Sequence, residues 1–440
     1  MKARPQRSRA ARYYVPALAT CVFMVGTVVV GDRLIAWLDL NLQPMRLPPS
    51  ARYTLRRPEF TAEIVTNSLG FREPHLPSQK PAGTRRIVVV GDSFAFGYGV
   101  AEAEAFPRQL ESVLLDTDPG SRWEVINLGV PGADPVTYMY HLRETGLAYA
   151  PDVVVIAVMA NDVHDTFLRE KYGNGGLSGI VRKARIEIRN HRPYWKRFAE
   201  WLLPEIYELV GTRIPGKASA AVVAARAEAF PAAGIQLASG ESGNPSVKAI
   251  LHALARRLDD GDEIAQRVDR LPSDMAERIA PVVLGDWSYE KATVQDHILR
   301  LGALLDPDAY IDGALLPQSH EASWEDMAAS VLSMVELARH EGAVVIVAFI
   351  PALHQLSRSP RDHLEHLGYR WTDSTLSDTT WPDRLGPVVT RSGAEFVDFL
   401  KILRGLPGEP PYFPLDGHWT ARGHALAART LATAVMAARR

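Results

Sequence analysis

The sequence predicts an α/β fold built on a doubly wound parallel sheet, and two observations carry this prediction. Residues 87–90 form an aliphatic run that stops abruptly at Gly91, Asp92 and Ser93, as in a strand that is buried on both faces. Largely apolar runs at 152–159 and 343–350 alternate with amphipathic helical segments, which is typical of parallel sheets with helices between the strands. In this fold class the carboxyl ends of the strands share one edge, where ligands bind.

The composition of the 440-residue chain narrows the classes of partner and site. Hydrophobic residues make up 47% of the chain, enough for a large core, and the formal net charge of −2 gives no electrostatic case for nucleic acid. Cys21 is the only cysteine, which excludes an intrachain disulfide and a cysteine-based zinc site. We therefore expect no nucleic-acid partner.

The N-terminal segment predicts a membrane anchor. Residues 1–12 are basic and residues 13–31 form an apolar run, with no acidic residue before Asp32. This run is close to the ~20 residues that cross a bilayer, and basic flanks stay in the cytoplasm. We expect a single pass through the inner (plasma) membrane, a cytoplasmic N-terminus and a periplasmic or extracellular domain. A cleaved signal peptide is the alternative, but residues 28–31 match a small-x-small cleavage site poorly.

Residues 32–84 are predicted to be a connector. Prolines recur throughout it, so no long helix fits, although short strands are possible at 51–55 and 62–65. Residues 67–70 (Asn-Ser-Leu-Gly) indicate a turn in which Gly70 takes a positive φ.

Residues 85–162 are predicted to form the first part of the α/β domain. Strands are expected at 87–90, 123–128 and 152–159, with helices near 103–115 and 135–147. Residues 163–320 interrupt the alternation with charged, alanine-rich sequence, which predicts a long, mostly helical insertion. Its basic stretch at 182–197 indicates a solvated helix face, with a polyanion or membrane-surface contact as the alternative.

The alternation resumes in residues 321–440, the second part of the domain. Helices are expected at 324–340 and 421–438, with strands at 343–350 and 395–398. Thr420 stands where the N-cap of the last helix should be.

Polar residues or tight glycines follow four predicted strand ends and can converge at one edge of the sheet. A serine hydroxyl needs a base within hydrogen-bond reach, and the pattern offers Ser93 as nucleophile with His418 as base. Asp416 can orient the imidazole. The N–H groups of Ser93 and Gly129 and the side-chain amide of Asn161 can supply an oxyanion hole. Asp92 is predicted to cap the following helix and to have no catalytic role.

These motifs resemble those of the SGNH (GDSL-type) hydrolases. Residues 91–93 match the first sequence block, residues 127–132 (Asn-Leu-Gly-Val-Pro-Gly) the second, and Asn161-Asp162 the third. Asp416-Gly417-His418 stands in the place of the last block. The resemblance implies a three-layer α/β/α flavodoxin-like fold, Gly129 as the oxyanion glycine, and no cofactor or metal. The α/β-hydrolase elbow, Gly-x-Ser-x-Gly, is excluded because Ala95 takes its last position.

Two differences from the family pattern point to a branch of it. Met159 replaces the glycine of the third block, and the last block reads Asp-x-His-Trp instead of Asp-x-x-His. The second variant resembles exported SGNH-like proteins that O-acetylate polysaccharides. Residues 67–72 resemble a lead-in of membrane-anchored bacterial SGNH proteins.

Four further histidines are predicted to lie outside the catalytic triad. His164 is expected in a loop at the rim of the active site, with a metal ligand as the alternative. His363 and His366 lack a third ligand, and His424 is expected on the outer face of the last helix.

The sequence thus predicts an ester-hydrolysing serine enzyme that works outside the cytoplasm on an ester or O-acetylated carbohydrate. One alternative is an O-acetyltransferase that modifies an exported polysaccharide, for which Tyr194, Trp195 and Trp201 of the insertion could stack on sugar rings. The other is a non-catalytic polysaccharide-binding or assembly protein on the same fold. Proteins of polysaccharide synthesis are possible partners, besides the membrane.

Overall fold

The computed structural model describes residues 47, 49–74, 79–172, 248, 252, 261–271, 300, 302–304 and 306–438. The chain divides into two compact units, and the described residues all lie in the larger one, 44–185 with 247–440. The predicted anchor at 13–31, the basic stretch at 182–197 and the aromatic residues Tyr194, Trp195 and Trp201 lie outside the described residues. Within the described ranges, no helix has both the length and the apolar character needed to cross a bilayer.

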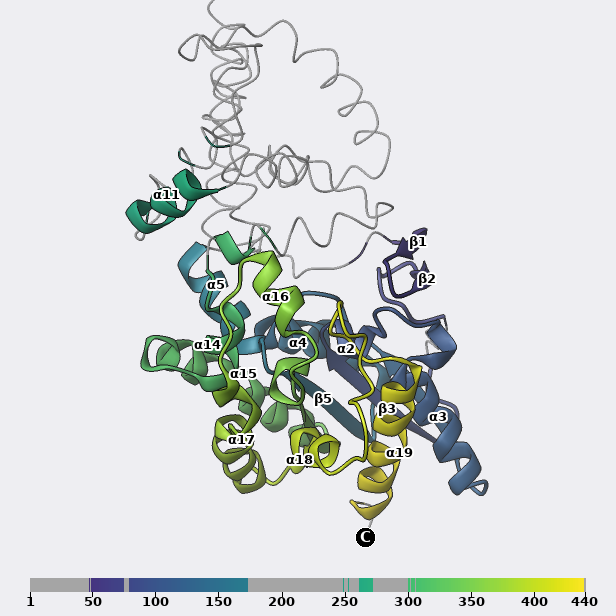
Figure 1. The fold of residues 1–440 in the computed structure, drawn as a ribbon. Coiled ribbons are helices and arrows are strands. Elements are labelled where there is room, and N and C mark those ends of the chain that lie inside the picture. The colour runs from purple at the N-terminus through teal and green to yellow at the C-terminus, as the bar shows by residue number, and fades with distance from the viewer. Residues whose placement is uncertain are drawn as a thin grey trace, which may run out of the picture. The chain divides into compact units, whose positions relative to one another are not determined.

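Five parallel strands form the central sheet, in the order β4-β3-β5-β6-β7 (Figure 1). Their bounds are β3 Thr84–Gly91, β4 Arg122–Asn127, β5 Val153–Met159, β6 Val344–Ile350 and β7 Glu395–Asp398. From β3 the chain adds β4 on one side of the sheet and then β5, β6 and β7 on the other. The chain therefore changes direction across the sheet between β3 and β5. Flavodoxin-like sheets bind their ligands at this point, outside the carboxyl ends of the strands.

The two central strands are buried because helices cover both faces of the sheet. All seven residues of β5 are buried, and Val88 of β3 pairs with Ile126 on one side and Val154 on the other. Strands covered on both faces are continuously aliphatic, which is why the runs at 87–90 and 153–158 could be read from the sequence.

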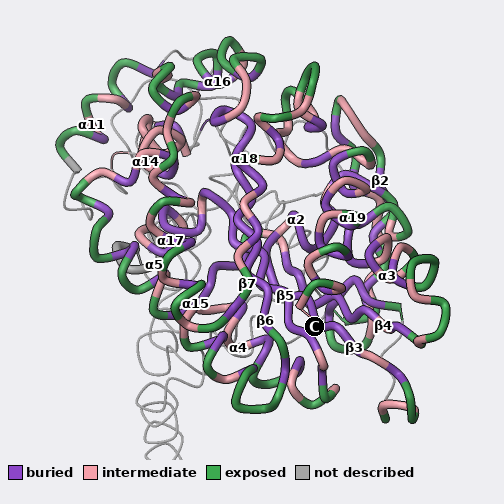
Figure 2. Tube along the Cα trace, turned by 90° about the horizontal axis from the view of Figure 1, so that it is seen from below, coloured by how far each residue is buried: buried purple, intermediate pink, exposed green. Residues whose placement is uncertain are grey.

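Two groups of helices cover the sheet (Figure 2). On one side, α3 (Phe106–Thr117) and α19 (Ala421–Ala437) pack against each other, and on the other, α15 (Glu321–His340) packs against α4 (Pro135–His141). The predicted doubly wound α/β/α architecture is therefore confirmed. The remaining described helices are α2 Ser93–Phe96, α5 Asp162–Tyr172, α11 Gly261–Arg270, α14 Ala309–Leu315, α16 Arg361–Leu367, α17 Thr380–Arg391 and α18 Phe399–Arg404.

A helix at 135–147 and Thr420 as an N-cap were predicted correctly, but each differs from the expectation in one detail. The helix expected at 135–147 is α-helical only to His141 and continues as a π-helical turn over Leu142–Gly146, in which Gly146 packs directly on Val88 of β3. Thr420 stands at the N-cap of α19, but its hydroxyl donates to the Pro411 carbonyl and not into the helix. Longer-range packing decides the geometry at both places.

His424 is buried, not on the outer face of the last helix. Its Nδ1 accepts a hydrogen bond from the N–H of Phe106, the first residue of α3, at 3.2 Å. Burial lowers the pKa of His424 to about 3, so the ring is neutral and serves as an acceptor. It supplies the N-terminal cap that Ala105 cannot give α3.

Residues 49–74, within the predicted connector, form an antiparallel hairpin that packs on the α/β body. Its strands are β1 Arg52–Arg56 and β2 Thr61–Val65. Leu55, Ala62 and Ile64 form a buried cluster with Phe96 of α2. The turn after β2 has Gly70 at φ 83°, as predicted.

Candidate active site

The turn from β3 to α2 holds Ser93 at the carboxyl end of the sheet. Asp92 is the N-cap of α2, and its Oδ1 accepts a hydrogen bond from the Phe94 N–H at 2.9 Å. Gly97 ends the helix at φ 80° after a single turn. Ser93 therefore stands on a short helix between a buried strand and a left-handed glycine.

Ser93, His418 and Asp416 form an unbroken chain of side-chain hydrogen bonds. Ser93 Oγ lies 2.7 Å from His418 Nε2, and His418 Nδ1 lies 2.5 Å from Asp416 Oδ1. The serine can donate to Nε2 only in the tautomer that carries its proton on Nδ1, where Asp416 accepts it. Although 325 positions separate them in sequence, Ser93 and His418 come together because β3 and the segment before α19 reach the same edge.

The loop that carries Asp416 and His418 is closed on itself and anchored in the core. Tyr412 pairs with Trp419 across its base, and Gly417 at φ 82° makes its tip. The N–H of Gly417 donates to the Phe413 carbonyl at 2.8 Å. Trp419 is only 1% exposed and packs against Phe94, so the residue after the histidine serves the core.

Aromatic rings surround the imidazole of His418. The ring of Tyr98 has its centroid 4.5 Å from that of His418, and the ring of Phe94 lies 5.1 Å away. The side chain of His418 keeps 18% of its surface exposed, while that of Asp416 keeps 5%. Water is thus largely removed from the Asp416 end of the pair, which strengthens its electrostatic interaction.

Asp92 is buried beneath Ser93, and this burial raises the pKa of its carboxyl to about 6. The Phe94 N–H and the nearby His418 oppose the shift. Asp92 Oδ2 lies 3.3 Å from Ser93 Oγ, farther than His418 Nε2. Its firm contact is the helix cap, as predicted.

Asp92→Asn is expected to stabilise the fold increasingly as the pH rises from 4 to 7. The folded-state pKa lies above the unfolded value, so the folded protein holds the proton longer and loses stability as pH rises through this window. A shift from 3.8 to about 6 corresponds to up to about 3 kcal/mol near pH 7. Asparagine keeps the capping oxygen without a charge. Thermal unfolding at several pH values measures the difference, with the exposed Asp116→Asn as control; a pH-independent difference would contradict the assignment.

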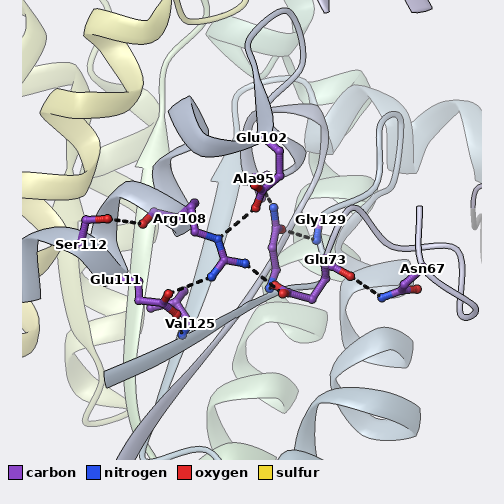
Figure 3. Close-up of polar contacts among 10 residues, drawn as sticks. Asn67, Glu73, Ala95, Glu102, Arg108, Glu111, Ser112, Val125 and Gly129 are labelled. Atoms are coloured by element: carbon purple, nitrogen blue, oxygen red, sulfur yellow. Dashed lines mark hydrogen bonds and ion pairs between the residues drawn. The ribbon is translucent and has the colours of Figure 1, made fainter. Parts of the chain in front are cut away.

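Asn127, at the end of β4, ties the nucleophile turn to the second sequence block (Figure 3). Its Nδ2 donates to the Ala95 carbonyl at 2.8 Å, and its Oδ1 accepts from the Gly129 N–H at 2.9 Å. The backbone N–H of Asn127 donates to Glu73 Oε2, while Glu73 Oε1 binds Arg108. The side chain of Asn127 therefore fixes α2 against the strand next to it.

These contacts change the expected oxyanion hole, because the Gly129 N–H already has an acceptor in Asn127. The neighbouring N–H groups are engaged too: Leu128 donates to Val89, Val130 to Gly91, and Ala133 to Val130. Pro131 has no N–H. Among the described residues, the Gly132 N–H alone in this segment donates no hydrogen bond, and Gly132 has φ 72°. Gly132 thus replaces Gly129 as the candidate donor of the oxyanion hole. The sequence contained a signal for this residue, because Gly132 is the second glycine of residues 127–132.

Gly129→Ala is expected to destabilise the fold by about 1–3 kcal/mol, because a Cβ would overpack a tight contact. The added atom would lie 2.5 Å from the Phe96 nitrogen and 2.7 Å from the Ala95 carbonyl carbon, both of them backbone. Denaturant unfolding measures the loss. Gly120→Ala is the control, since a Cβ there meets nothing within 4 Å. Equal stability of the two variants would contradict this packing role.

Asn161 is the second residue after β5 and is held by the start of α5. Its Nδ2 donates to Asp165 Oδ2 at 2.7 Å, which leaves the second N–H of the amide for another acceptor. Burial raises the pKa of Asp165 well above its usual range. Helix α14 lies against this turn, since a Cβ on its Gly313 would come within 4.0 Å of the Asn161 Cα.

His164 lies within α5 and not in a loop, with its Nε2 3.8 Å from Asp306 Oδ2. In the part of the chain that the structure describes, no three His, Cys, Asp or Glu side chains gather as a metal site. The structure thus brings Ser93, Asp416 and His418 into contact, and it places His164 beside the carboxylate of Asp306.

Comparison with known proteins bears on this arrangement. Residues 89–261 match the model of the GDSL-like Lipase/Acylhydrolase family, a range that includes Ser93, Gly132 and Asn161 and ends before Asp416. No curated protein matches the chain.

Three solved structures are similar to this chain, each at low identity. TesA is 12% identical, with 80% of this chain and 99% of that chain covered and a TM-score of 0.34. A GDSL-like lipase from Bacteroides thetaiotaomicron is 11% identical, with 82% and 93% covered and a TM-score of 0.31. A variant of an acetyl xylan esterase from Geobacillus stearothermophilus is 12% identical, with 81% and 95% covered and a TM-score of 0.32. The family match is the finding that bears on function.

Proposed function

We propose, from the premise that this chain is an ester-hydrolysing enzyme with a GDSL-like lipase/acylhydrolase domain, that Ser93, His418 and Asp416 are its catalytic triad. The observation that carries the proposal is the hydrogen-bonded chain from Ser93 Oγ through His418 to Asp416, at 2.7 and 2.5 Å. A nucleophile, a base and an orienting carboxylate within contact distance are the arrangement that acyl transfer needs.

In the first half-reaction, Ser93 Oγ attacks the ester carbonyl carbon and gives its proton to His418 Nε2. Asp416 stabilises the imidazolium through Nδ1 and keeps the ring in the required tautomer. The C–O bond of the tetrahedral intermediate then breaks, His418 returns the proton to the leaving alcohol, and an acyl group remains on Ser93.

The tetrahedral oxygen carries a negative charge that preorganised donors stabilise. We assign this role to the N–H of Ser93 at the start of α2, the N–H of Gly132 and the Nδ2 group of Asn161. The support is that each has a hydrogen left for an acceptor and that each follows a strand, β3, β4 or β5, at the same edge of the sheet. Asp165 holds the amide of Asn161 in place.

In the second half-reaction, we propose that water attacks the acyl group on Ser93 and gives a proton to His418. The bond to Ser93 Oγ then breaks, His418 returns the proton to Oγ, and the carboxylic acid is released. A sugar hydroxyl in place of water would make the chain an O-acetyltransferase. Trp419, which belongs to the sequence variant that resembles such transferases, is buried against Phe94, Phe106 and Phe399. It therefore offers no surface to a sugar, and hydrolysis is the simpler reaction for this site.

Product analysis tests this proposal on the 440-residue chain in detergent. The protein is given p-nitrophenyl acetate with and without candidate oligosaccharides, and mass spectrometry follows the acetyl group. We expect free acetate as the main product in both cases. Acetylated oligosaccharide with little free acetate would establish the transferase, and no release of p-nitrophenol would favour the non-catalytic alternative.

We also propose that the catalytic body lies outside the cytoplasm, anchored in the inner membrane by residues 13–31. The support is the sequence alone: a basic segment, an apolar run and no acidic residue before Asp32. A reporter that is active only outside the cytoplasm, fused after Arg440, is expected to work. Activity only of a cytoplasmic reporter would contradict this orientation.

A further inference from the structure

The tip of the loop that carries Asp416 is held by a residue far away in the sequence, Glu59. This residue stands in the turn between β1 and β2. Its carboxylate accepts the Leu415 N–H at 3.0 and 3.1 Å and the Asp416 N–H at 2.7 Å. Two successive N–H groups on one carboxylate form a charge-assisted contact stronger than a neutral one.

Few hydrogen bonds hold the side chain of Asp416 in place. Its Oδ1 contacts His418, while its Oδ2 is buried with no hydrogen-bond partner among the described residues. Among the described residues, His418 alone therefore bonds the carboxylate from the side-chain end. The placement of Asp416 depends on its backbone, and that backbone is the part that Glu59 binds.

The hairpin is fixed firmly enough to serve as a support. Arg72, which is 2% exposed, donates to the carbonyls of Gly97 at 2.7 Å and Val100 at 2.8 Å in the loop after α2. It also donates to the Glu63 carbonyl of β2 at 3.0 Å. One buried guanidinium thus joins the hairpin to the segment that leaves the nucleophile helix.

The aromatic contacts follow the same path. Phe60, next to Glu59, touches Phe413 at the base of the Asp416 loop, with the ring centroids 4.9 Å apart. It also touches Tyr98, whose ring lies against His418. Arg57 donates to the hydroxyl of Tyr98 at 2.9 Å. The turn of the hairpin therefore contacts both the loop that carries His418 and the ring of Tyr98, which lies against His418.

We propose that Glu59 is a positioning residue for the catalytic pair, which holds the Asp416 loop so that His418 stays within hydrogen-bond distance of Ser93. The proposal rests on the proposed function of the triad. It adds a residue of the hairpin to those that maintain the active site. Glu59 acts through the backbone of Asp416 and touches neither the substrate nor the reacting atoms.

The test compares Glu59→Ala and Glu59→Gln with the wild-type chain on p-nitrophenyl acetate. We expect kcat to fall roughly 10- to 100-fold in Glu59→Ala, because a small displacement of a catalytic group has an effect of this size. KM and the unfolding temperature are expected to stay close to wild type. Glu59→Gln keeps one carbonyl oxygen as acceptor and is expected to recover much of kcat. The rate at which a fluorophosphonate labels Ser93 should follow kcat.

Glu63→Ala is the matched control, since it removes an exposed carboxylate on the same hairpin whose ion pair, within the part of the chain that the structure describes, is with Arg52 at 3.9 Å. It is expected to behave like wild type. Wild-type kcat in Glu59→Ala, or a lowered unfolding temperature with unchanged kcat and labelling, would overturn the inference. A wild-type chain that neither turns over the ester nor is labelled at Ser93 would defeat the proposed function instead, and this inference with it.

Discussion

Ser93→Ala is expected to lower kcat for a short-chain aryl acetate by roughly four to six orders of magnitude, as loss of a triad nucleophile does elsewhere. The variant keeps the fold, because the hydrogen bonds of the hydroxyl among the described residues are those to His418 and Asp92. Without Oγ no acyl-enzyme forms, and the oxyanion donors can accelerate only direct attack by water. Steady-state kinetics, with circular dichroism to confirm folding, provide the measurement.

Ser112→Ala is the matched control for this variant. The Ser112 hydroxyl is exposed on α3 and donates to the Arg108 carbonyl at 3.3 Å, away from the site. It is expected to keep wild-type turnover. If purified Ser93→Ala turned over the ester at the wild-type rate, Ser93 would not be the nucleophile.

His418→Ala is expected to reduce kcat by roughly 10⁴- to 10⁶-fold, and Asp416→Ala by one or two orders of magnitude less. The histidine moves the proton, whereas the aspartate orients the ring and stabilises its charge. In Asp416→Ala, the rings of Phe94 and Tyr98 still contact the imidazole and preserve part of its orientation.

Both variants are measured with the same aryl acetate, beside His340→Ala as control. The His340 side chain is 83% exposed and contacts Glu341, so wild-type kinetics are expected there. A greater loss of kcat in Asp416→Ala than in His418→Ala would show that His418 is not the base. Activity retained in His418→Ala would direct the search to another histidine, with His164 first.

Local pattern was sufficient to predict the sheet and the convergence of the strand ends. Strands β3, β5 and β6 are covered on both faces, so their aliphatic runs stand out from the rest of the chain. A parallel sheet places its strand ends together, which is why Ser93 and His418 could be paired across most of the sequence.

The same pattern could not show which backbone N–H groups would be bound by side chains. Residues 127–132 contain two glycines, and the hydrogen bond from the Gly129 N–H to Asn127 Oδ1 shows which of them is already engaged. For His424, by contrast, the sequence did contain a signal that the residue is buried. It precedes Ala427, Ala428, Leu431 and Val435 by 3, 4, 7 and 11 residues, the spacing of the buried face of α19.

The contribution of the hairpin also escaped sequence reasoning, because it depends on contacts across hundreds of residues. Glu59 meets Leu415 and Asp416 at separations of 356 and 357 positions. Neither the prolines of 32–84 nor the short strands indicate such a contact. A carboxylate in a proline-rich stretch has no periodic pattern that would show what it binds.

The buried pair Arg72 and Glu73 makes the choice of a starting residue decisive for anyone who prepares a shortened form of this protein. The family match begins at residue 89, which invites a cut just before β3. Such a cut would leave the Gly97 and Val100 carbonyls and the Asn127 N–H without their buried partners. Each orphaned group costs about 1–3 kcal/mol, a large share of the stability of a typical domain. A version that starts before β1 retains these contacts and is the form in which the isolated body should be purified.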